Sequence, residues 1–371
     1  MKIVIIVFVS LFANYFVLFA QQEHLFLTVI SDSTNENHLK NYEIKTEGQW
    51  FLGFQQINLL STNKNQFTLK RGYITFKKDF TENLSVRFTQ DITLDEEGSD
   101  AGNIEMRLKY CYLKYNTNQL LFFNSTYFEF GLVHRPWLSF EEDINKYRVQ
   151  GTMYLERYDI LNSADFGLTF VGLLGAKIQD DEFVKNSKTP PGKFGSFAIG
   201  IYNGGGYHAI ENTNNKTIEG RVTVRPLHYD LPGLQLSYTF GYGKGNIETL
   251  PDFNFNSGIL SYESESFVFS YQLYDGKGNS SGSMSDTNGV AYENNGYSIF
   301  NELKLLNSNI SFFGRYDNFK SQNTESLRII FGAAYYFTNK SKFIVDIDYF
   351  ALNKLSNLKT RIIEAAIEIV F

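Results

Sequence analysis

The sequence predicts an all-β fold, a transmembrane antiparallel β-barrel of about 16 strands with a long constriction-type loop after strand 5. Three observations predict this class: an alternating segment that ends on Phe371, an apolar N-terminal run, and a chain rich in tyrosine and phenylalanine. The alternative that stays open is a secreted β-sandwich or lectin, which would also contain alternating strands.

The segment 361–371 alternates between two faces. Counting back by two from Phe371 gives an unbroken apolar face, whereas the other face carries Glu364 and Glu368. One face suits lipid and the other suits water, as in a strand of a membrane barrel. The ends of soluble domains are usually polar, and this one is aromatic.

The first 20 residues have the pattern of a secretory signal peptide. An apolar run extends from Ile3 to Ala20 and then turns abruptly polar. We expect cleavage after Ala20; the alternative is an uncleaved anchor, because the run is about long enough to cross a bilayer once. The predicted organisation is a signal peptide at 1–20, a periplasmic N-terminal segment at 21–43 and the barrel at 44–371.

Composition narrows the class further. The 371 residues include 24 tyrosines and 35 phenylalanines, yet the mean hydropathy is -0.25. Beyond residue 20 no stretch reaches the length of a transmembrane helix, and Cys111, the single cysteine, has no partner within the chain. A net charge of -6 without a basic run argues against nucleic acid as a partner. No spacing of ligands predicts a metal or a cofactor.

Sixteen alternating segments bounded by Asn, Gly, Ser and Asp are predicted strands. Many have about the ten residues that a tilted strand needs to cross the hydrocarbon layer, and the number is even, as in single-chain bacterial barrels. The predicted spans are 44–55, 66–77, 84–93, 104–115, 127–135, 165–175, 194–203, 219–227, 233–243, 256–263, 266–275, 296–305, 309–317, 326–337, 342–352 and 360–371.

The connections between these spans alternate in length. If Phe371 lies at the periplasmic rim, periplasmic turns should be short and extracellular loops long, and most of them are. Two periplasmic positions strain the rule: residues 176–193 and residues 116–126. Either an extra periplasmic element exists or the strand count is wrong by one pair. A barrel of about 16 strands keeps an open aqueous channel, and 21–43 is too short for a plug, so the sequence predicts a passive pore.

Several motifs also resemble a known family. Residues 131–137 (GLVHRPW), Phe140-Glu141-Glu142, residues 147–151 (YRVQG) and residues 162–167 (NSADFG) are similar to outer-membrane porins of Bacteroidetes related to the phosphate-selective porin O and P family. Residues 67–73 (FTLKRGY) resemble a strand of that family. The similarity is sharpest over residues 66–175 and diffuse afterwards.

The resemblance implies a sixteen-stranded channel of the bacterial outer membrane, commonly a homotrimer. It implies contact with membrane lipid, recognition of Phe371 by the barrel assembly machinery, and passive diffusion of small polar or charged solutes, including anions such as phosphate. A channel dedicated to phosphate would be lined by lysine and arginine, and the net charge of -6 does not favour that selectivity.

The longest connection, from Pro136 to Ala164, carries the most charge. Connections this long are usually functional, and charged groups at a narrow opening act strongly on ions. We expect this loop to fold into the barrel and narrow it; the alternative is a solvated surface flap. Its candidate constriction residues are Glu141, Glu142, Asp143, Lys146, Arg148, Glu156 and Arg157.

Strand parity gives candidate channel-lining residues. Cations dominate the early strands and carboxylates the last two, so we expect a mixed, weakly selective constriction with a transverse field. For each residue the alternative is a salt bridge that only stiffens the barrel. The candidates are Arg87, Arg107, Lys109, Arg135, Arg221, Arg225, Asp346, Asp348, Glu364 and Glu368.

Two other functions stay open. A surface binding or adhesion protein would have external loops that seal the mouth and prevent conductance. A barrel hydrolase would place a histidine within hydrogen-bond reach of a serine or carboxylate near the outer rim, although no histidine in this sequence has such an arrangement nearby. We expect no enzyme activity.

Overall fold

The computed structural model describes residues 43–59, 63–95, 101–178, 187–322, 324–353 and 358–371. The predicted signal peptide and most of the predicted periplasmic segment lie outside these residues. Ile44–Phe371 forms one compact unit. No helix in the described residues is both long and apolar enough to cross a membrane.

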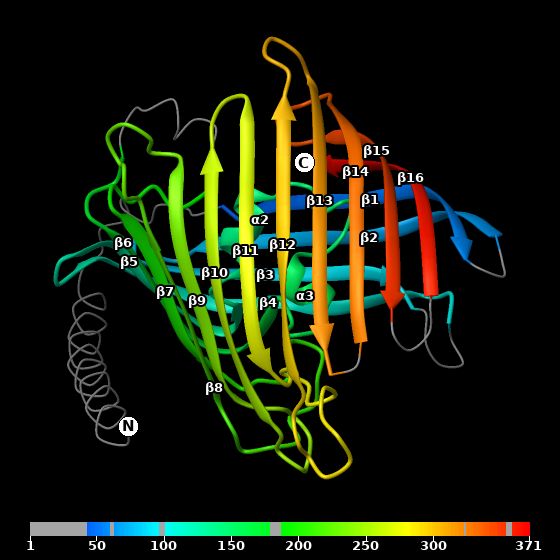
Figure 1. Ribbon diagram of the computed structural model, residues 1–371. Helices are drawn as coiled ribbons and strands as arrows, with labels where there is room; N and C mark the ends of the chain where they lie inside the picture. Colours follow the sequence, from blue (N-terminus) through cyan, green and yellow to red (C-terminus); the bar gives the residue numbers. More distant parts are fainter. Residues whose placement is uncertain (1–42, 60–62, 96–100, 179–186, 323, 354–357) are drawn as a thin grey trace. The chain divides into compact units, whose positions relative to one another are not determined.

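Sixteen antiparallel strands form a closed barrel, as the sequence predicts (Figure 1). Each strand pairs with its neighbours in sequence, and β16 returns to pair with β1. The strands are β1 Lys45–Leu59, β2 Asn63–Asp79, β3 Leu84–Leu94, β4 Ile104–Leu120, β5 Phe123–His134, β6 Ala164–Leu174, β7 Gly195–Tyr202, β8 Thr217–Val224, β9 Leu234–Lys244, β10 Asp252–Glu263, β11 Phe267–Lys277, β12 Glu293–Lys304, β13 Ile310–Ser321, β14 Thr324–Tyr336, β15 Lys342–Asn353 and β16 Leu358–Val370.

The barrel closes next to Phe371. Gly48 and Phe371 exchange two backbone hydrogen bonds, of 2.9 and 3.0 Å. A side chain at Gly48 would meet the Phe371 ring, since a Cβ built there would lie 2.1 Å from it. The aromatic ring therefore covers a site that only glycine leaves open. We call this end of the barrel, where odd-numbered strands begin, the Phe371 rim.

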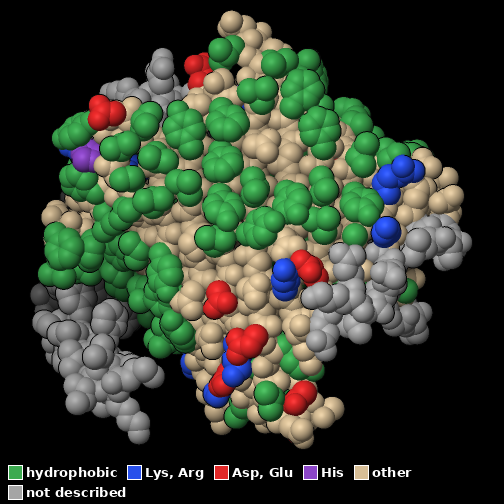
Figure 2. All heavy atoms as spheres, viewed as in Figure 1, with side chains coloured by type: hydrophobic (Ala, Val, Ile, Leu, Met, Phe, Trp, Pro, Cys, Tyr) green, Lys and Arg blue, Asp and Glu red, His purple; other side chains and the backbone are tan. Residues whose placement is uncertain are grey.

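Side chains alternate between the outer and inner faces of the wall. In β15, Phe343, Val345 and Ile347 are 41–47% exposed, whereas Asp346 and Asp348 are at most 7% exposed. Figure 2 shows hydrophobic side chains spread over the outer wall and charged ones gathered mostly toward its ends. An apolar outer face and a polar inner face are the pattern of a barrel that stands in lipid.

Two β-bulges break the alternation on the inner wall. In β2 the pairing shifts between Phe51 and Leu52 of β1, so Lys70 is an extra residue and both Lys70 and Arg71 make inner-wall contacts. In β4 the extra residue is Lys109, and both Lys109 and Tyr110 line the interior. A bulge places two residues opposite one and so changes the parity of the strand.

The structure settles the two unusual connections. Residues 116–126 are not a long turn, because β4 continues to Leu120 and β5 begins at Phe123. Residues 176–193 do form a long connection between β6 and β7, at the Phe371 rim. The strand count is therefore correct, and the alternative of a missing strand pair is wrong.

Candidate functional site

The connection between β5 and β6 lies inside the ring of strands (Figure 1). It contains two short helices, α2 Leu138–Ile144 and α3 Tyr154–Arg157. Its apolar side chains are buried, which a solvated flap would not allow. The buried ones are Trp137, Leu138, Phe140, Ile144, Tyr147, Val149, Met153, Tyr154, Leu155, Ile160 and Leu161.

Aromatic contacts hold this loop against the inner wall of the later strands. Tyr147 stacks on Phe313 of β13, with 4.0 Å between the ring centroids, and its hydroxyl donates a 2.7 Å hydrogen bond to Glu302 of β12. Tyr158 stacks on Phe319 at 4.6 Å. Each such pair adds about 0.5–1.5 kcal/mol beyond the area that it buries. The loop therefore packs on one side of the barrel.

Hydrogen bonds between the wall and the loop fix the same position. Arg315 of β13 donates to the Thr152 carbonyl at 2.9 Å, and the loop's Tyr154 hydroxyl donates to the Asn318 carbonyl of β13 at 2.7 Å. On the other side, Lys70 donates to the Gln150 carbonyl at 3.1 Å. Arg315 and Lys70 thus provide partners for carbonyls of the loop.

Arg135, where the loop begins, is an anchor as well as a predicted lining residue. Its guanidinium is fully buried and pairs with Asp165 at 3.0 Å and with Glu219, and it also donates to the Gly204 carbonyl at 3.2 Å. Removing one partner of such a buried pair costs about 3–5 kcal/mol, because it leaves a charge uncompensated. Arg135 thus fixes where the loop leaves the wall.

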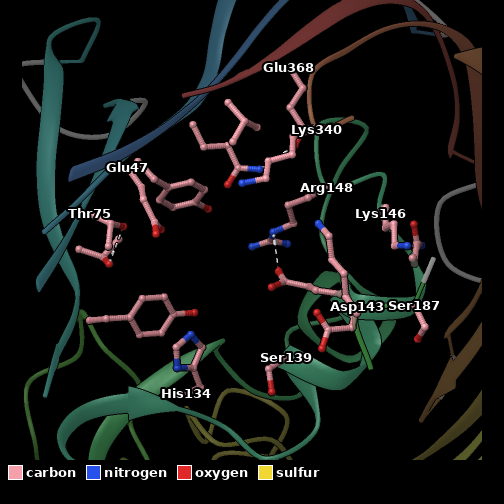
Figure 3. A pocket seen from close by; sticks show the side chains of 18 of the residues that line it. Glu47, Thr75, His134, Ser139, Asp143, Lys146, Arg148, Ser187, Lys340 and Glu368 are labelled. Atoms are coloured by element: carbon pink, nitrogen blue, oxygen red, sulfur yellow. Dashed lines mark hydrogen bonds and ion pairs between the residues drawn. The ribbon is translucent and has the colours of Figure 1, made fainter. Parts of the chain in front are cut away.

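A cavity of about 1280 Å³ lies between the loop and the wall and reaches the Phe371 rim, where residues of the later strands also line it. Figure 3 shows Glu47 and Thr75 on one side of it and Arg148 and Asp143 on the other. Among the residues that the structure describes, twelve lysines and arginines line the cavity, against five carboxylates, Glu47, Glu129, Glu142, Asp143 and Glu368. The basic residues are Lys77, Arg87, Lys109, Lys114, Arg135, Lys146, Arg148, Lys188, Arg221, Lys304, Lys340 and Lys342.

Three of these cations lie on tyrosine rings. Lys109 is 4.8 Å from the Tyr73 ring centroid, and Arg87 is 4.8 Å from that of Tyr110. Lys114 is 3.6 Å from the Tyr127 centroid, and it stands opposite Glu129 in the strand register. Among the described residues, none of the three cations forms an ion pair with a carboxylate. All three belong to the lining of the cavity.

Other predicted lining cations have different partners. Arg107 lies 3.6 Å from Asp91 and 3.5 Å from Glu105, and it is not among the residues that line the cavity. Arg221 donates to the Pro136 carbonyl at 3.0 Å, which ties β8 to the loop. Arg225 follows β8 and donates to two carbonyls of the β6–β7 connection.

Ion pairs partly neutralise the predicted acidic arc of β15 and β16. Glu368 pairs with Lys342 at 2.5 Å, Glu364 with Lys70, and Asp348 with Arg328 at 3.5 Å. Asp346 stands opposite Glu364 in the strand register. The sequence prediction omitted the pairing of Lys70 and Lys342 with these acids.

The charged residues of the loop pair mainly with one another. Arg148 contacts Glu142 at 2.9 Å and Glu156 at 2.6 Å, and Arg157 donates to Gln150 at 2.9 Å. Burial raises the pKa of Glu141 to about 7.

Four charged loop residues line the cavity, and two of them, Asp143 and Lys146, have clearly shifted pKa values. Burial raises the pKa of Asp143 to about 8. Burial also lowers the pKa of Lys146, beside the repulsion of nearby lysines. Both shifts follow from the cost of holding charge away from bulk water.

Sequence reasoning missed the tyrosines and one histidine. Tyr110, Tyr112 and His134 line the cavity beside the cations, and the His134 ring stacks on Tyr110 with 3.8 Å between centroids. His134 also lies 3.4 Å from Arg87, so it belongs to a cluster of cations and aromatic rings. Strand parity alone could not find the two tyrosines, because the bulge at Lys109 reverses it in β4.

No family model and no curated protein matches this chain. Solved structures share its fold. The anion-selective porin from Comamonas acidovorans has a TM-score of 0.63 at 11% identity, over 89% of this chain and all of that one. Salmonella typhi OmpF in complex with daunomycin gives 0.60 at 11% identity, over 90% of this chain and 99% of that one. The outer-membrane channel DcaP of Acinetobacter baumannii has a TM-score of 0.59 at 10% identity, over 90% of this chain and 99% of that one. The fold is therefore that of the sixteen-stranded porins.

Proposed function

We propose that this protein is a porin of the bacterial outer membrane that lets small solutes diffuse passively and prefers anions. The observation that carries the preference is the charge of the cavity. The whole chain has a net charge of -6, yet in the described part of the chain twelve basic and five acidic residues line the cavity. Position within the fold, rather than composition, sets the field that a solute meets.

The path runs along the earlier strands. The loop packs on the later strands and leaves the opposite wall open, where Arg87, Lys109 and Lys114 stand on tyrosine rings. Cations that are partly removed from bulk water interact strongly with a passing anion. Phosphate is one candidate solute, because its oxygens accept hydrogen bonds from ammonium, guanidinium and hydroxyl groups.

Location in the outer membrane follows from the outer wall and the closed barrel. Large apolar side chains on the outer wall are well exposed, for example Phe130 at 65%, Phe331 at 63% and Met106 at 56%. Contact of such side chains with water is unfavourable, whereas contact with lipid is not. A closed sheet has no unpaired edge, as a bilayer requires. We also propose a cleaved signal peptide, residues 1–20, and a homotrimer, both of which rest on the sequence.

The two alternative functions, surface adhesion and hydrolysis, require structural features that a channel does not need. An adhesion protein needs external loops that seal the mouth. A hydrolase needs a histidine beside a serine or carboxylate, whereas His134 lies between Arg87 and Tyr110. The cavity and its charge favour a channel over both.

Single-channel recording in planar bilayers tests the proposal. The purified barrel should conduct, and in asymmetric potassium chloride its reversal potential should lie toward that of chloride. Phosphate added to one side should reduce the chloride current if it occupies the cationic wall. Absence of any conductance would favour a surface binding protein, and a reversal potential on the potassium side would reject the anion preference.

A further inference from the structure

We infer that residues 187–192, in the connection from β6 to β7, form a second narrowing of the path at the Phe371 rim, where Lys188 helps to select anions. We call these six residues the rim segment. The inference rests on the proposed porin function and adds to it a second selective position in the same cavity as Lys109.

The rim segment is attached to the inner wall of β9 and β10. The hydroxyls of Ser187 and Thr189 donate to one carboxylate oxygen of Glu263, at 2.8 and 3.1 Å. Gln235 of β9 donates to the Thr189 hydroxyl at 3.2 Å. Gln235 is fully buried and Thr189 is 3% exposed. These contacts lie on the inner face of the strands, so the segment folds inward.

Arg225 holds the rim segment from β8. Its guanidinium donates to the Gly192 carbonyl at 3.1 Å and to the Pro190 carbonyl at 3.1 Å. The Pro191 carbonyl accepts a 2.8 Å bond from the Ile178 amide. Proline fixes the φ angle and cannot donate a backbone hydrogen bond, so the two prolines restrict the segment while side chains of the wall bind its carbonyls.

The free face of the rim segment lines the cavity. Ser187, Lys188 and Pro190 belong to its lining, together with Asp143 and Lys146 of the constriction loop. Figure 3 shows Ser187 on the same side of the cavity as Lys146. A solute that leaves the loop toward the Phe371 rim therefore passes Lys188, and a charge at such an opening acts on every ion that crosses it.

A pair of charge reversals in the same connection tests the role of Lys188. Lys188→Glu should lower the anion-to-cation permeability ratio by about twofold or more at low salt, because it changes the local charge by two units. The matched control is Lys193→Glu, since Lys193 donates to the exposed Tyr229 hydroxyl at 2.7 Å and does not line the cavity. Equal shifts in the two variants, or no shift in Lys188→Glu, would overturn the inference.

A second variant tests the attachment itself. Thr189→Val keeps the size of the side chain and removes the hydroxyl that Glu263, Gln235 and Arg225 contact. Conductance should rise, and Lys188→Glu should have a smaller effect in this background, since coupled residues are not additive. Unchanged conductance with a full Lys188→Glu effect would show that the segment is not held in the way we infer. A wild-type barrel that does not conduct would instead reject the porin function.

Discussion

Arg107 and Lys109 stand two residues apart in β4 and meet different surroundings. Arg107 has two carboxylates within 3.6 Å, whereas Lys109 donates to the Tyr73 hydroxyl at 3.2 Å. A cation beside a carboxylate presents little net charge to an ion in the path, and a cation beside a neutral hydroxyl presents most of it. The partners of a residue, rather than its type, decide its effect on selectivity.

Neutralising Lys109 should therefore reduce anion preference more than neutralising Arg107. A unit charge about 10 Å from an anion contributes roughly 1–2 kcal/mol at an effective dielectric constant of about 20, and salt weakens it. We expect a several-fold fall in the anion-to-cation permeability ratio for Lys109→Gln at low salt. Lys78→Gln is the control, because Lys78 does not line the cavity. The measurement is the reversal potential of Lys109→Gln, Arg107→Gln and Lys78→Gln. A larger shift for Arg107→Gln than for Lys109→Gln would show that ions do not pass close to Lys109.

The raised pKa of Asp143, about 8, predicts a pH-dependent selectivity. Its carboxyl is neutral below about pH 7 and charged above about pH 9, given that pKa. The cavity thus gains one negative charge as pH rises, and anion preference should fall. The groups that act on Asp143 are Lys188, Glu142, Glu263 and Lys146.

Asp143→Asn should remove most of this pH dependence. Burial lowers the pKa of Lys146, and loss of its positive charge as pH rises would change selectivity in the same direction. The measurement is the reversal potential of the wild-type and Asp143→Asn channels, recorded from pH 7 to pH 9. A wild-type selectivity that stays constant would show that Asp143 does not act on the path.

At the scale of elements, the loop after β5 folds inward because one side of it is apolar. Its buried aromatic and aliphatic residues pack on residues of β10 to β14 such as Phe255, Phe313 and Phe319. Removing them from water is favourable by about 25 cal/mol for each square ångström of apolar area. The polar side of the loop is then left facing the cavity, which is how Arg148 and Asp143 reach it.

Replacing residues 141–148 with a short Gly/Ser link should raise single-channel conductance. The replacement removes Ile144 and Tyr147, which fill the lumen, while the ladder of strand hydrogen bonds remains. The control is the same replacement at residues 286–289, in the connection between β11 and β12. If conductance does not change, or if the control raises it equally, the loop is not the narrowest part of the path.

In the whole molecule, closure of the barrel places alternate side chains on an outer apolar face or on an inner face around the cavity. The chain as a whole has more acidic than basic residues, yet the described residues that line the cavity are mostly basic. The acids of β15 and β16 are largely paired within the wall, through Lys342, Lys70 and Arg328. The balanced transverse field that the strand sequence predicts is therefore weakened on its acidic side.

Replacing Phe371 with aspartate should impair assembly of the barrel. The ring packs on Gly48 where β16 meets β1, and a barrel must close this seam because unpaired strand edges are costly in lipid. The measurement is the fraction of heat-modifiable barrel in outer-membrane extracts. Leu121→Asp is the matched control, since Leu121 is 78% exposed in a turn. Normal amounts of folded barrel in the Phe371 variant would contradict the prediction.

Patterns within the sequence were enough to predict the strands and the closed barrel. Alternation with a period of two is a local property, so all sixteen strands could be located from their own residues. The longest connection was likewise visible from its length, and its charged and aromatic residues could be named. The ends of β4 and β5 were missed because polar residues such as Asn116 and Asn118 continue the ladder there.

Which charges are paired and which face the cavity could be learned only from the folded barrel. Ion pairs such as Lys70 with Glu364 join residues 294 positions apart, and no local pattern encodes such a contact. The bulges at Lys70 and Lys109 reverse strand parity, so the tyrosines around Lys109 could not be assigned by counting. The inward fold of residues 187–192 depends on Glu263, Gln235 and Arg225, which three different parts of the barrel supply. Contacts of this kind exist only once β8, β9 and β10 have paired side by side, because that pairing brings the three residues together.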